Sequence, residues 1–433
     1  MKELADITVC VVDRGTFYPI AERLARDVKK VYFHNPEREA FEHFAKGCLG
    51  DGHDDVELLV DFWLIKKQID LFVFPDCADA GLQLELASQG FPVWGSKTAS
   101  SLETMRGQWL NICEELGFKM PKTHRIQGLT NLRLFLRENE GTEFFVKISR
   151  WRGDMETWST SSPERTENKL DNLALRFGRF KDGLMFYVQE ATDAELEGGA
   201  DTFNIHGQWP DKIILGYEKK GESYLATWKH REEMPGEIWN ITESIGPTLG
   251  EHQYANFVSS EVRFDDEASY WLDPCLRFPS PAGEEQLELY VNFSEIVWSG
   301  ANGILVQPEM AGKFCGEAVI SYCGDKDGWK SLRVPEESRR WVKLYANVQH
   351  QDGSVDFPPE QDMEAIGCAV AIADTPKGVI DQLKEIAESM SDQPVELHIT
   401  EIADLIEEIS EAENKGIPFS EGPMPAPAEV LEK

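Results

Sequence analysis

Two acidic residues are spaced so that they could hold a metal ion against the phosphates of a nucleotide. Glu261 stands in the segment FVSSEVRF and Asp273 in YWLDPCLRF, and 273 − 261 = 12 positions separate them. Residues 258–263 and 270–272 are apolar or β-branched runs joined by DDEAS, which predicts two strands and a polar hairpin connection. A hairpin brings residues on either side of its turn opposite one another, so both carboxylates can converge on one face. Two carboxylates suffice for Mg²⁺, or Mn²⁺, when phosphate oxygens and water complete the coordination shell.

The alternative is that Glu261 and Asp273 are solvated acids flanking a turn, because the chain contains 77 Asp and Glu residues. A basic residue supports the nucleotide hypothesis. Lys147 lies in EFFVKIS, residues 143–149, which is predicted to be a strand. A lysine among apolar neighbours needs an anionic partner, and a phosphate fits because a Gly-containing polar loop, RWRGDMETWSTSS, follows. In the competing interpretation Lys147 alternates onto a solvated face of its strand.

Composition and charge exclude several classes of protein. The chain has 433 residues with 41% hydrophobic residues, 12 Trp and 23 Phe, enough for two or three folded cores. The formal charge of −34, from 43 basic and 77 acidic side chains, opposes binding to nucleic acid, whose affinity depends on basic groups. No apolar run approaches the roughly 18 residues of a membrane span, and MKELADITVC carries no signal-peptide pattern. We therefore expect a cytoplasmic protein without membrane or nucleic-acid partners.

The eight cysteines fit a reducing compartment. Cys10, Cys113 and Cys368 lie in apolar patterns typical of small core residues. Cys315 and Cys323 are close in sequence, but no CxxC pair or histidine cluster accompanies them, so a zinc site is not expected.

The first hundred residues alternate strands and helices. Four strands are predicted in this part, at residues 7–12, 31–36, 70–76 and 91–95, together with a helix over residues 18–28. Strands separated by helices predict a parallel sheet with right-handed crossovers. The first strand is followed by Asp13-Arg14-Gly15-Thr16, which lacks the glycine spacing of a dinucleotide-binding loop.

The remaining chain changes character twice. A helix over residues 101–116 opens a middle region of antiparallel strands that ends with a helix over residues 284–298. After about residue 300 a small α+β unit follows, with helices at residues 375–390 and 402–409, and the last residues form a Pro-rich tail. This pattern predicts a first domain boundary near residue 98.

The order of these elements, with LFVFPDCADAGLQLELASQGFPVWGSKTASSLE before an Arg-bearing helix, resembles the ATP-grasp superfamily and within it the phosphoribosylamine–glycine ligase family. The resemblance spans most of the chain. It implies an α/β and α+β protein with an N-terminal parallel α/β (pre-ATP-grasp) domain at residues 1–98 and an ATP-grasp domain at residues 99–305. A small C-terminal α+β domain at residues 306–414 and the tail at residues 415–433 complete it.

The resemblance also implies roles for individual residues. Arg106 and Lys147 match the two basic positions that meet the nucleotide phosphates, and Glu261 and Asp273 match the two metal carboxylates. Arg277, in an Arg-Phe-x-x-Pro sequence with Phe278 and Pro281, matches the arginine that steadies the acyl phosphate or substrate carboxylate. Lys147 and Arg277 are thus the implied catalytic residues.

The remaining nucleotide contacts follow from the same resemblance. Val188, Gln189 and Glu190 match the segment that meets the adenine, and Asp201 resembles the acid that binds the ribose hydroxyls. ATP and Mg²⁺ (or Mn²⁺) are the implied cofactors. The implied reaction joins a small carboxylate to an amine through an acyl phosphate and releases ADP.

Three departures from the family pattern concern the site. Cys275 stands where the family has Asn two positions after the second metal acid, and residues 149–154, SRWRGD, replace a loop of small residues. The connection from Gln189 to Asp201 is also long, so Glu195 or Glu197 could take the place of Asp201. We therefore keep two hypotheses: a ligase with altered substrates, or a catalytically impaired protein of the same fold that binds nucleotide or a partner. The sequence does not name the substrates or the oligomeric state.

Overall fold

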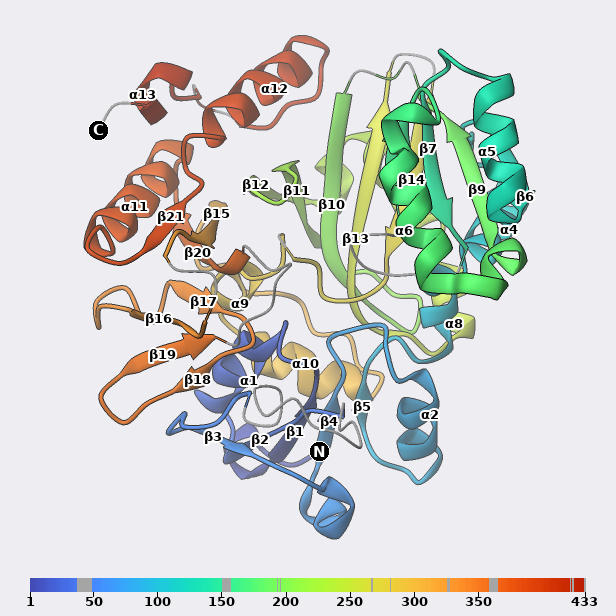
Figure 1. Ribbon diagram of the computed structural model, residues 1–433. Helices are drawn as coiled ribbons and strands as arrows, with labels where there is room; N and C mark the ends of the chain where they lie inside the picture. Colours follow the sequence, from blue (N-terminus) through green and yellow to red (C-terminus); the bar gives the residue numbers. More distant parts are fainter. Residues whose placement is uncertain are drawn as a thin grey trace. The chain divides into compact units, whose positions relative to one another are not determined.

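The computed structural model (Figure 1) describes residues 1–36, 49–149, 157–192, 194, 196–265, 268–280, 282–324, 328–357, 365–420, 422 and 424–431. The chain forms two compact units. Unit 1 comprises Met1–Ala99, Gly198–Ser260 and Cys275–Lys433, and unit 2 comprises Ser100–Glu197 and Glu261–Pro274. Unit 2 lies within the range predicted for the ATP-grasp domain, and the division into three domains and a tail stays a prediction.

A parallel sheet forms the N-terminal part of unit 1, as predicted (blue in Figure 1). It has five strands where four were predicted, because the short strand Val56–Leu58 was not expected. Its order is β3-β2-β1-β4-β5, with β1 Thr8–Val12, β2 Lys30–His34, β3 Val56–Leu58, β4 Leu71–Val73 and β5 Val93–Trp94. Side chains alternate along β1: Val9 and Val11 pack with helix α1 (Tyr18–Ala25), and Cys10 and Val12 pack in a cluster with Leu86 of α2 (Ala80–Ser88). Because β1 is buried on both faces, its sequence is a continuous apolar run.

The larger sheet of unit 1 is antiparallel. Its strands follow the order β13-β10-β11-β12-β15-β20-β17, and β21 also pairs with β15. The bounds are β13 Ala255–Phe264, β10 Leu196–Ile205, β11 Lys212–Lys219, β12 Ser223–His230, β15 Phe314–Tyr322, β20 Ala365–Ala373, β17 Val342–Leu344 and β21 Val395–Leu397. A separate sheet has the order β16-β19-β18, with β16 Lys330–Arg333, β19 Ser354–Phe357 and β18 Val348–Gln349.

The helices of unit 1 cover these sheets. Helix α11 packs against β15 and β20, and its N-cap Thr375 accepts a hydrogen bond of 3.1 Å from the Gly378 N–H. The remaining helices are α7 Gly236–Glu243, α8 Gly246–Glu251, α9 Gln286–Leu289, α10 Phe293–Ala301, α11 Pro376–Ser389, α12 Ile402–Asn414 and α13 Pro427–Leu431. Helix α13 lies in the tail, for which no helix was predicted. No helix in the described part of the chain is long and apolar enough to cross a membrane.

Unit 2 is built on a four-stranded antiparallel sheet in the order β6-β9-β7-β8. Its elements are α3 Ser100–Thr104, α4 Arg106–Glu115, β6 Thr123–Gln127, α5 Leu129–Glu138, β7 Phe144–Ile148, β8 Thr157–Thr160, α6 Glu167–Phe177, β9 Met185–Glu190 and β14 Ser269–Cys275. Leu132 and Leu136 of α5 and Leu170 and Leu173 of α6 pack on one face of the sheet. Strands β13 and β14 are neighbours, so the predicted pairing of the two acid-bearing strands is confirmed.

Short 3-10 helices lie at Leu4–Asp6, Phe62–Leu64, Lys66–Gln68, Lys97–Ala99, Glu164–Thr166, Gly178–Gly183 and Arg231–Glu233.

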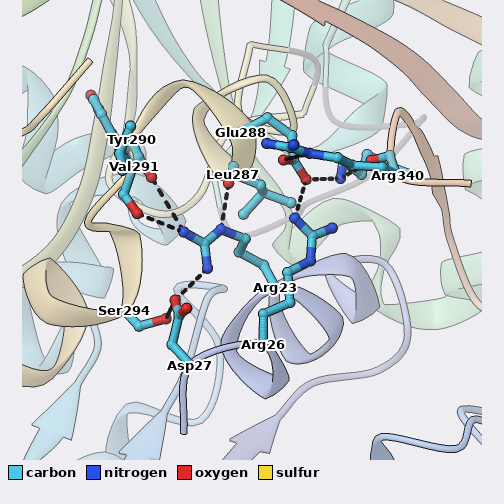
Figure 2. Close-up of polar contacts among 10 residues, drawn as sticks. Arg23, Arg26, Asp27, Leu287, Glu288, Tyr290, Val291, Ser294 and Arg340 are labelled. Atoms are coloured by element: carbon cyan, nitrogen blue, oxygen red, sulfur yellow. Dashed lines mark hydrogen bonds and ion pairs between the residues drawn. The ribbon is translucent and has the colours of Figure 1, made fainter. Parts of the chain in front are cut away.

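The predicted helix over residues 284–298 is wrong as a continuous element, because α9 ends at Leu289 and α10 begins at Phe293. Figure 2 shows that the Arg23 guanidinium from α1 donates to backbone carbonyls at this break. Its Nε donates to the Leu287 oxygen at 2.7 Å, and its Nη2 donates to the Tyr290 and Val291 oxygens at 3.4 and 3.0 Å. The predicted helix over residues 101–116 is likewise interrupted, at Met105.

Candidate functional site

The sheet of unit 2 has one covered face and one face that carries polar groups. In the register of β7 and β9, Lys147 pairs with Tyr187 and Phe145 pairs with Gln189, so these four side chains share a face. The opposite face carries Val146 and the residues that pack on α5 and α6. The hypothesis that Lys147 alternates onto a solvated face is wrong, because the residue is 5% exposed.

Arg106, Lys147 and Asp273 form an ion cluster beside this face. Arg106 is the first residue of α4, and its Nη1 forms an ion pair with Asp273 Oδ1. The Lys147 Nζ donates to Asp273 Oδ2 at 2.6 Å, and Arg106 Nη2 donates to the Thr157 hydroxyl of β8 at 3.0 Å. Two cations from different elements therefore converge on one carboxylate.

The cavity at this cluster is almost filled. Its lining residues include Arg106, Lys147, Gln189 and Asp273, and its volume is only about 10 Å³. A nucleotide could enter only if the ion cluster opened, and the Asp273 carboxylate now holds the cations that a phosphate would take. Asp273 has the most exposed side chain of the three charged residues, at 39%, so it is the group that can leave most easily.

The charges of the cluster adjust one another's protonation. Burial lowers the pKa of Lys147, the Asp273 carboxylate opposes that effect, and Arg106 adds to it. Burial works against ionisation of Asp273, but the positive charges of Lys147 and Arg106 outweigh it and lower the pKa of that carboxyl. The two cations therefore favour the ionised form of Asp273.

Glu261 completes the acidic part of the site. It lies on β13 beside β14, and its negative charge partly offsets the lowering of the Lys147 pKa by burial. The chemistry of the donor set fits Mg²⁺, because Glu261 and Asp273 both offer carboxylate oxygens near a cation pair suited to phosphate. Asp273 would have to exchange Lys147 and Arg106 for the metal.

The segment predicted to meet the adenine points in two directions. Gln189 is 4% exposed and donates from Nε2 to the Thr123 hydroxyl at 3.2 Å, on the face that carries Lys147. Val188 is fully buried in the core on the other face. Glu190 points away from Gln189 as well, and its carboxylate accepts a 2.7 Å hydrogen bond from Lys122, which lowers the pKa of Glu190.

Asp201 is placed in the core of unit 1, at 1% exposure. Its Oδ2 accepts a 2.5 Å hydrogen bond from the Tyr224 hydroxyl, and burial raises the pKa of the carboxyl to about 6. This environment does not favour contact with a ribose, and that role stays a prediction. Glu197, an alternative for the same role, is ion-paired with Arg263 at 2.6 Å in unit 2, whereas Glu195 lies outside the described residues.

Arg277 also belongs to unit 1, and its two neighbours in the chain make hydrogen bonds and ring contacts within that unit. The Leu276 carbonyl accepts a 2.5 Å hydrogen bond from the Ser96 hydroxyl, and the Phe278 N–H donates to the Pro75 oxygen at 2.9 Å. The Phe278 ring packs edge-on against Phe17 and Phe257. Residues 150–156 of the unusual loop and Pro281 lie outside the described residues.

Several residues of the site carried no signal in the sequence. Trp271 donates from Nε1 to the Asp273 carbonyl at 2.9 Å and packs edge-on against Trp109 of α4, which positions the acid. Gly107 allows the Tyr187 hydroxyl to approach α4, because a Cβ at that position would overlap it. These contacts join residues far apart in sequence, and only the alternation of Trp271 and Asp273 along β14 hints at them.

Unit 1 contains an acidic pair at the carboxyl edge of its parallel sheet. Asp13 follows β1 and accepts hydrogen bonds from the Gly15 and Phe17 N–H groups, at 2.6 and 3.0 Å. Burial, and next to it the negative charge of Asp76, raises the pKa of Asp13 to about 6. Ligands of open α/β sheets bind at this edge, so the pair is a candidate for contact with a cationic group.

A second acidic group lies deep in unit 1. Donor atoms of Glu284, Glu317 and Cys368 lie within 4.8 Å of one another, and all three residues are fully buried. Burial raises the pKa values of all three side chains.

No protein-family model matches the chain, and no curated protein matches it in sequence. Solved structures do match it over nearly its whole length. Phosphoribosylamine–glycine ligase from Thermotoga maritima has a TM-score of 0.66 at 16% identity, covering 90% of this chain and 97% of that one. For L-amino acid ligase from Bacillus licheniformis the TM-score is 0.60 at 15% identity, covering 91% and 98%. For biotin carboxylase from Campylobacter jejuni it is 0.61 at 13% identity, covering 95% and 97%.

These similarities extend across both compact units and agree with the order of strands and helices predicted from the sequence. At 13–16% identity they establish the architecture and leave the substrates open. The chain has the ATP-grasp fold.

Proposed function

We propose that the chain is an ATP-dependent carboxylate–amine ligase that forms ADP through an acyl phosphate. The observation that carries the proposal is the meeting of Arg106 and Lys147 on one acid, Asp273, beside the polar face of the unit 2 sheet. Two convergent cations suit a phosphate, since charge-assisted hydrogen bonds to phosphate are strong. Structures of the same fold include a carboxyaminoimidazole ribonucleotide synthase from Aspergillus clavatus in complex with ATP.

In this proposal the chain's residues bind and orient the reactants. Lys147 and Arg106 release Asp273 and neutralise the phosphates, which lowers the repulsion that an incoming carboxylate would meet. A carboxylate oxygen attacks the γ-phosphorus and ADP leaves. An amine nitrogen then attacks the acyl carbon, phosphate leaves, and the amine gives up a proton. Arg277, as the resemblance implies, would steady the acyl group.

Metal binding follows from the release of Asp273. Glu261 and Asp273 would hold Mg²⁺, or Mn²⁺, which supplies further positive charge to the phosphates when bound.

Gln189 is the polar candidate for the adenine, because it shares the face of Lys147. Asp13 and Asp76 are candidates for the amine, because an ammonium group would relieve their repulsion. The expected location, the cytoplasm, belongs to the same proposal.

One observation favours a second candidate, a nucleotide-binding protein with impaired catalysis. Asp273 is already satisfied by two cations, and Cys275 stands two positions further, where the family has a better oxygen ligand. Such a protein would bind ATP without carboxylate-dependent ADP formation.

The proposal is tested by calorimetric titration of Mg·ATP into the wild type and Lys147→Met. Because methionine keeps most of the volume and removes the charge, the variant should bind ATP at least about tenfold more weakly. Lys330→Met is a matched control: Lys330 is also 5% exposed and lies on a strand, but in unit 1. Equal affinities in the wild type and Lys147→Met would reject the phosphate role.

A further inference from the structure

Unit 1 contains a large cavity that the proposed function does not use. Its volume is about 650 Å³, within the range of small-molecule sites. The lining residues come from the second half of α1, the segment before β3, the end of α9 and the segment 336–343. The cavity is therefore built from elements that are far apart in sequence.

A buried carboxylate lies in the wall of this cavity among three cations. Glu288 is 1% exposed, and its two oxygens accept hydrogen bonds from Arg26 Nη1 at 2.7 Å, Arg340 Nε at 2.7 Å and Lys343 Nζ at 2.6 Å. Figure 2 shows Arg26 and Arg340 converging on Glu288. Burial opposes ionisation of this acid, but Lys343 and Arg26 outweigh it and lower the pKa of Glu288 to about 2. The local balance is one negative charge against three positive charges.

One cation is enough to neutralise one buried carboxylate. Two of the three cations on Glu288 are therefore not needed to neutralise it. Lys343, whose side chain is 4% exposed, is the natural partner of Glu288. Arg26 and Arg340 are 38% and 59% exposed, and each uses a single nitrogen on Glu288. Within the described residues, their other guanidinium N–H groups make no further hydrogen bond.

Arg339 adds a third accessible guanidinium. It is 29% exposed and pairs with Glu22 through Nη2 alone among the described residues. Arg23, on the same wall, differs: its side chain is 8% exposed, and its donors are taken by Asp27 and by three backbone carbonyls. Arg23 therefore belongs to the fold, whereas the other three arginines keep donors for a ligand.

The lining holds six acidic side chains and five Lys and Arg side chains, so the arrangement of the arginine donors, and not the net charge, favours an anion. Glu22 is matched by Arg339, and His53 Nδ1 lies 3.2 Å from the same carboxylate. Asp54, Asp55 and Glu336 are exposed, so water and salt screen their charges. The accessible donors of the wall thus remain those of the arginines.

The position of the cavity separates it from the expected substrate edge. The second half of α1 and the start of β3 lie toward the amino-terminal edge of the parallel sheet, whereas Asp13 and Asp76 follow the carboxyl ends of β1 and β4. Ligands of such sheets ordinarily bind at the carboxyl edge. The residues proposed for the nucleotide phosphates, Arg106 and Lys147, belong to unit 2.

We propose that this cavity binds a small polyanion with two or more phosphoryl or carboxylate groups. Arg26, Arg339 and Arg340 recognise it, because each planar guanidinium can present paired N–H donors to an oxyanion. Glu288 stays paired with Lys343 and fixes the orientation of Arg26 and Arg340.

The experiment is calorimetric titration of the full chain with tripolyphosphate and, separately, with citrate, which distinguishes phosphoryl from carboxylate ligands. Arg340→Gln should weaken binding of the preferred anion severalfold, and Arg26→Gln combined with Arg340→Gln should weaken it by about tenfold or more. Arg333→Gln is the matched control, because Arg333 is 57% exposed, pairs with Asp352 and lies outside the cavity. Its affinity should equal that of the wild type.

Lys147→Met separates this site from the proposed nucleotide site. Anion binding in the cavity should survive in Lys147→Met even if Mg·ATP binding is lost, so either proposal can fail alone. Unchanged binding of both anions in Arg340→Gln and in the double variant would overturn the inference. So would the absence of binding in the wild type. Light scattering showing that Arg340→Gln dissociates a dimer, without altering anion binding, would instead assign this wall to contact between two copies.

Discussion

Replacing Glu288 by Gln should destabilise unit 1 strongly at neutral pH. The carboxylate is 1% exposed and accepts hydrogen bonds from Arg26, Arg340 and Lys343. Glutamine keeps the shape but removes the charge, and it leaves the Lys343 ammonium, 4% exposed, without a buried counter-charge. Breaking a buried pair by removing one partner costs about 3–5 kcal/mol.

The pKa of Glu288 gives a second measure of the same effect. A carboxyl whose pKa falls from 4.5 to about 2 on folding stabilises the folded state by about 3 kcal/mol at neutral pH. The folded-state pKa is lowered, so this stabilisation is complete above pH 4.5 and is lost as the pH falls toward 2. The difference in stability between wild type and Glu288→Gln should therefore be largest at neutral pH and should shrink steadily as the pH falls from 4.5 toward 2.

The assay is urea unfolding of wild type and Glu288→Gln at neutral pH and at several acidic pH values. Glu336→Gln is the matched control, since Glu336 is an exposed acid on the same cavity, and its unfolding midpoint should not change. Adding Lys343→Met to Glu288→Gln removes both buried charges and should restore much of the lost stability. A loss below about 1 kcal/mol, or a loss that does not depend on pH, would refute the reasoning.

Three further predictions concern the site and the core. In the double variant Glu261→Ala with Asp273→Ala, the increase in ATP affinity that Mg²⁺ causes should be at least about tenfold smaller than in the wild type. The circular dichroism spectrum should not change. An undiminished effect of Mg²⁺ in calorimetry would remove the metal assignment. Burial and Asp76 raise the pKa of Asp13 from 3.8 to about 6, so ionisation at higher pH costs stability. The melting temperature of Asp13→Asn should exceed that of the wild type at pH 8, and the two should become equal near pH 4. A difference in melting temperature that stays the same at both pH values would contradict this. Gly216→Ala should lower the free energy of unfolding by about 1–3 kcal/mol, because its Cβ would overlap a buried tyrosine hydroxyl. Gly81→Ala, which lies on a helix with open space around it, should raise that free energy by up to about 1 kcal/mol. Equal urea midpoints for the two variants would contradict the packing.

Elements that depend on local patterns could be predicted from the sequence. The apolar run at residues 7–12 yields β1, Thr8–Val12, and the run at residues 70–76 yields β4, Leu71–Val73. The acid-bearing hairpin also follows from its own residues, since two short strand patterns flank a polar turn. Each of these signals lies within one stretch of chain, and the parallel sheet follows from their alternation with helices.

Features that depend on distant residues could not be predicted. At the break between α9 and α10, Arg23 binds three carbonyls more than 260 positions away, and Val291 N–H donates to the Glu309 oxygen. The ion pair of Lys147 with Asp273 joins residues 126 positions apart, and no local pattern encodes it. Asp201 is buried because Tyr224, on a different strand, covers it. Long-range register and side-chain pairing decide these cases, and they leave no periodic trace in a single sequence.

The proposed function requires the Lys147 face of unit 2 to activate a carboxylate with ATP. Hydroxylamine can replace the unknown amine, because it converts an acyl phosphate to a hydroxamate. The measurement is ADP and hydroxamate formation by the wild type and Lys147→Met with Mg·ATP, hydroxylamine and pools of small carboxylates. We expect equal amounts of ADP and hydroxamate with at least one pool, and a loss of both products in Lys147→Met. ATP binding without ADP formation in any pool, or ADP formation unchanged in Lys147→Met, would contradict the proposed function.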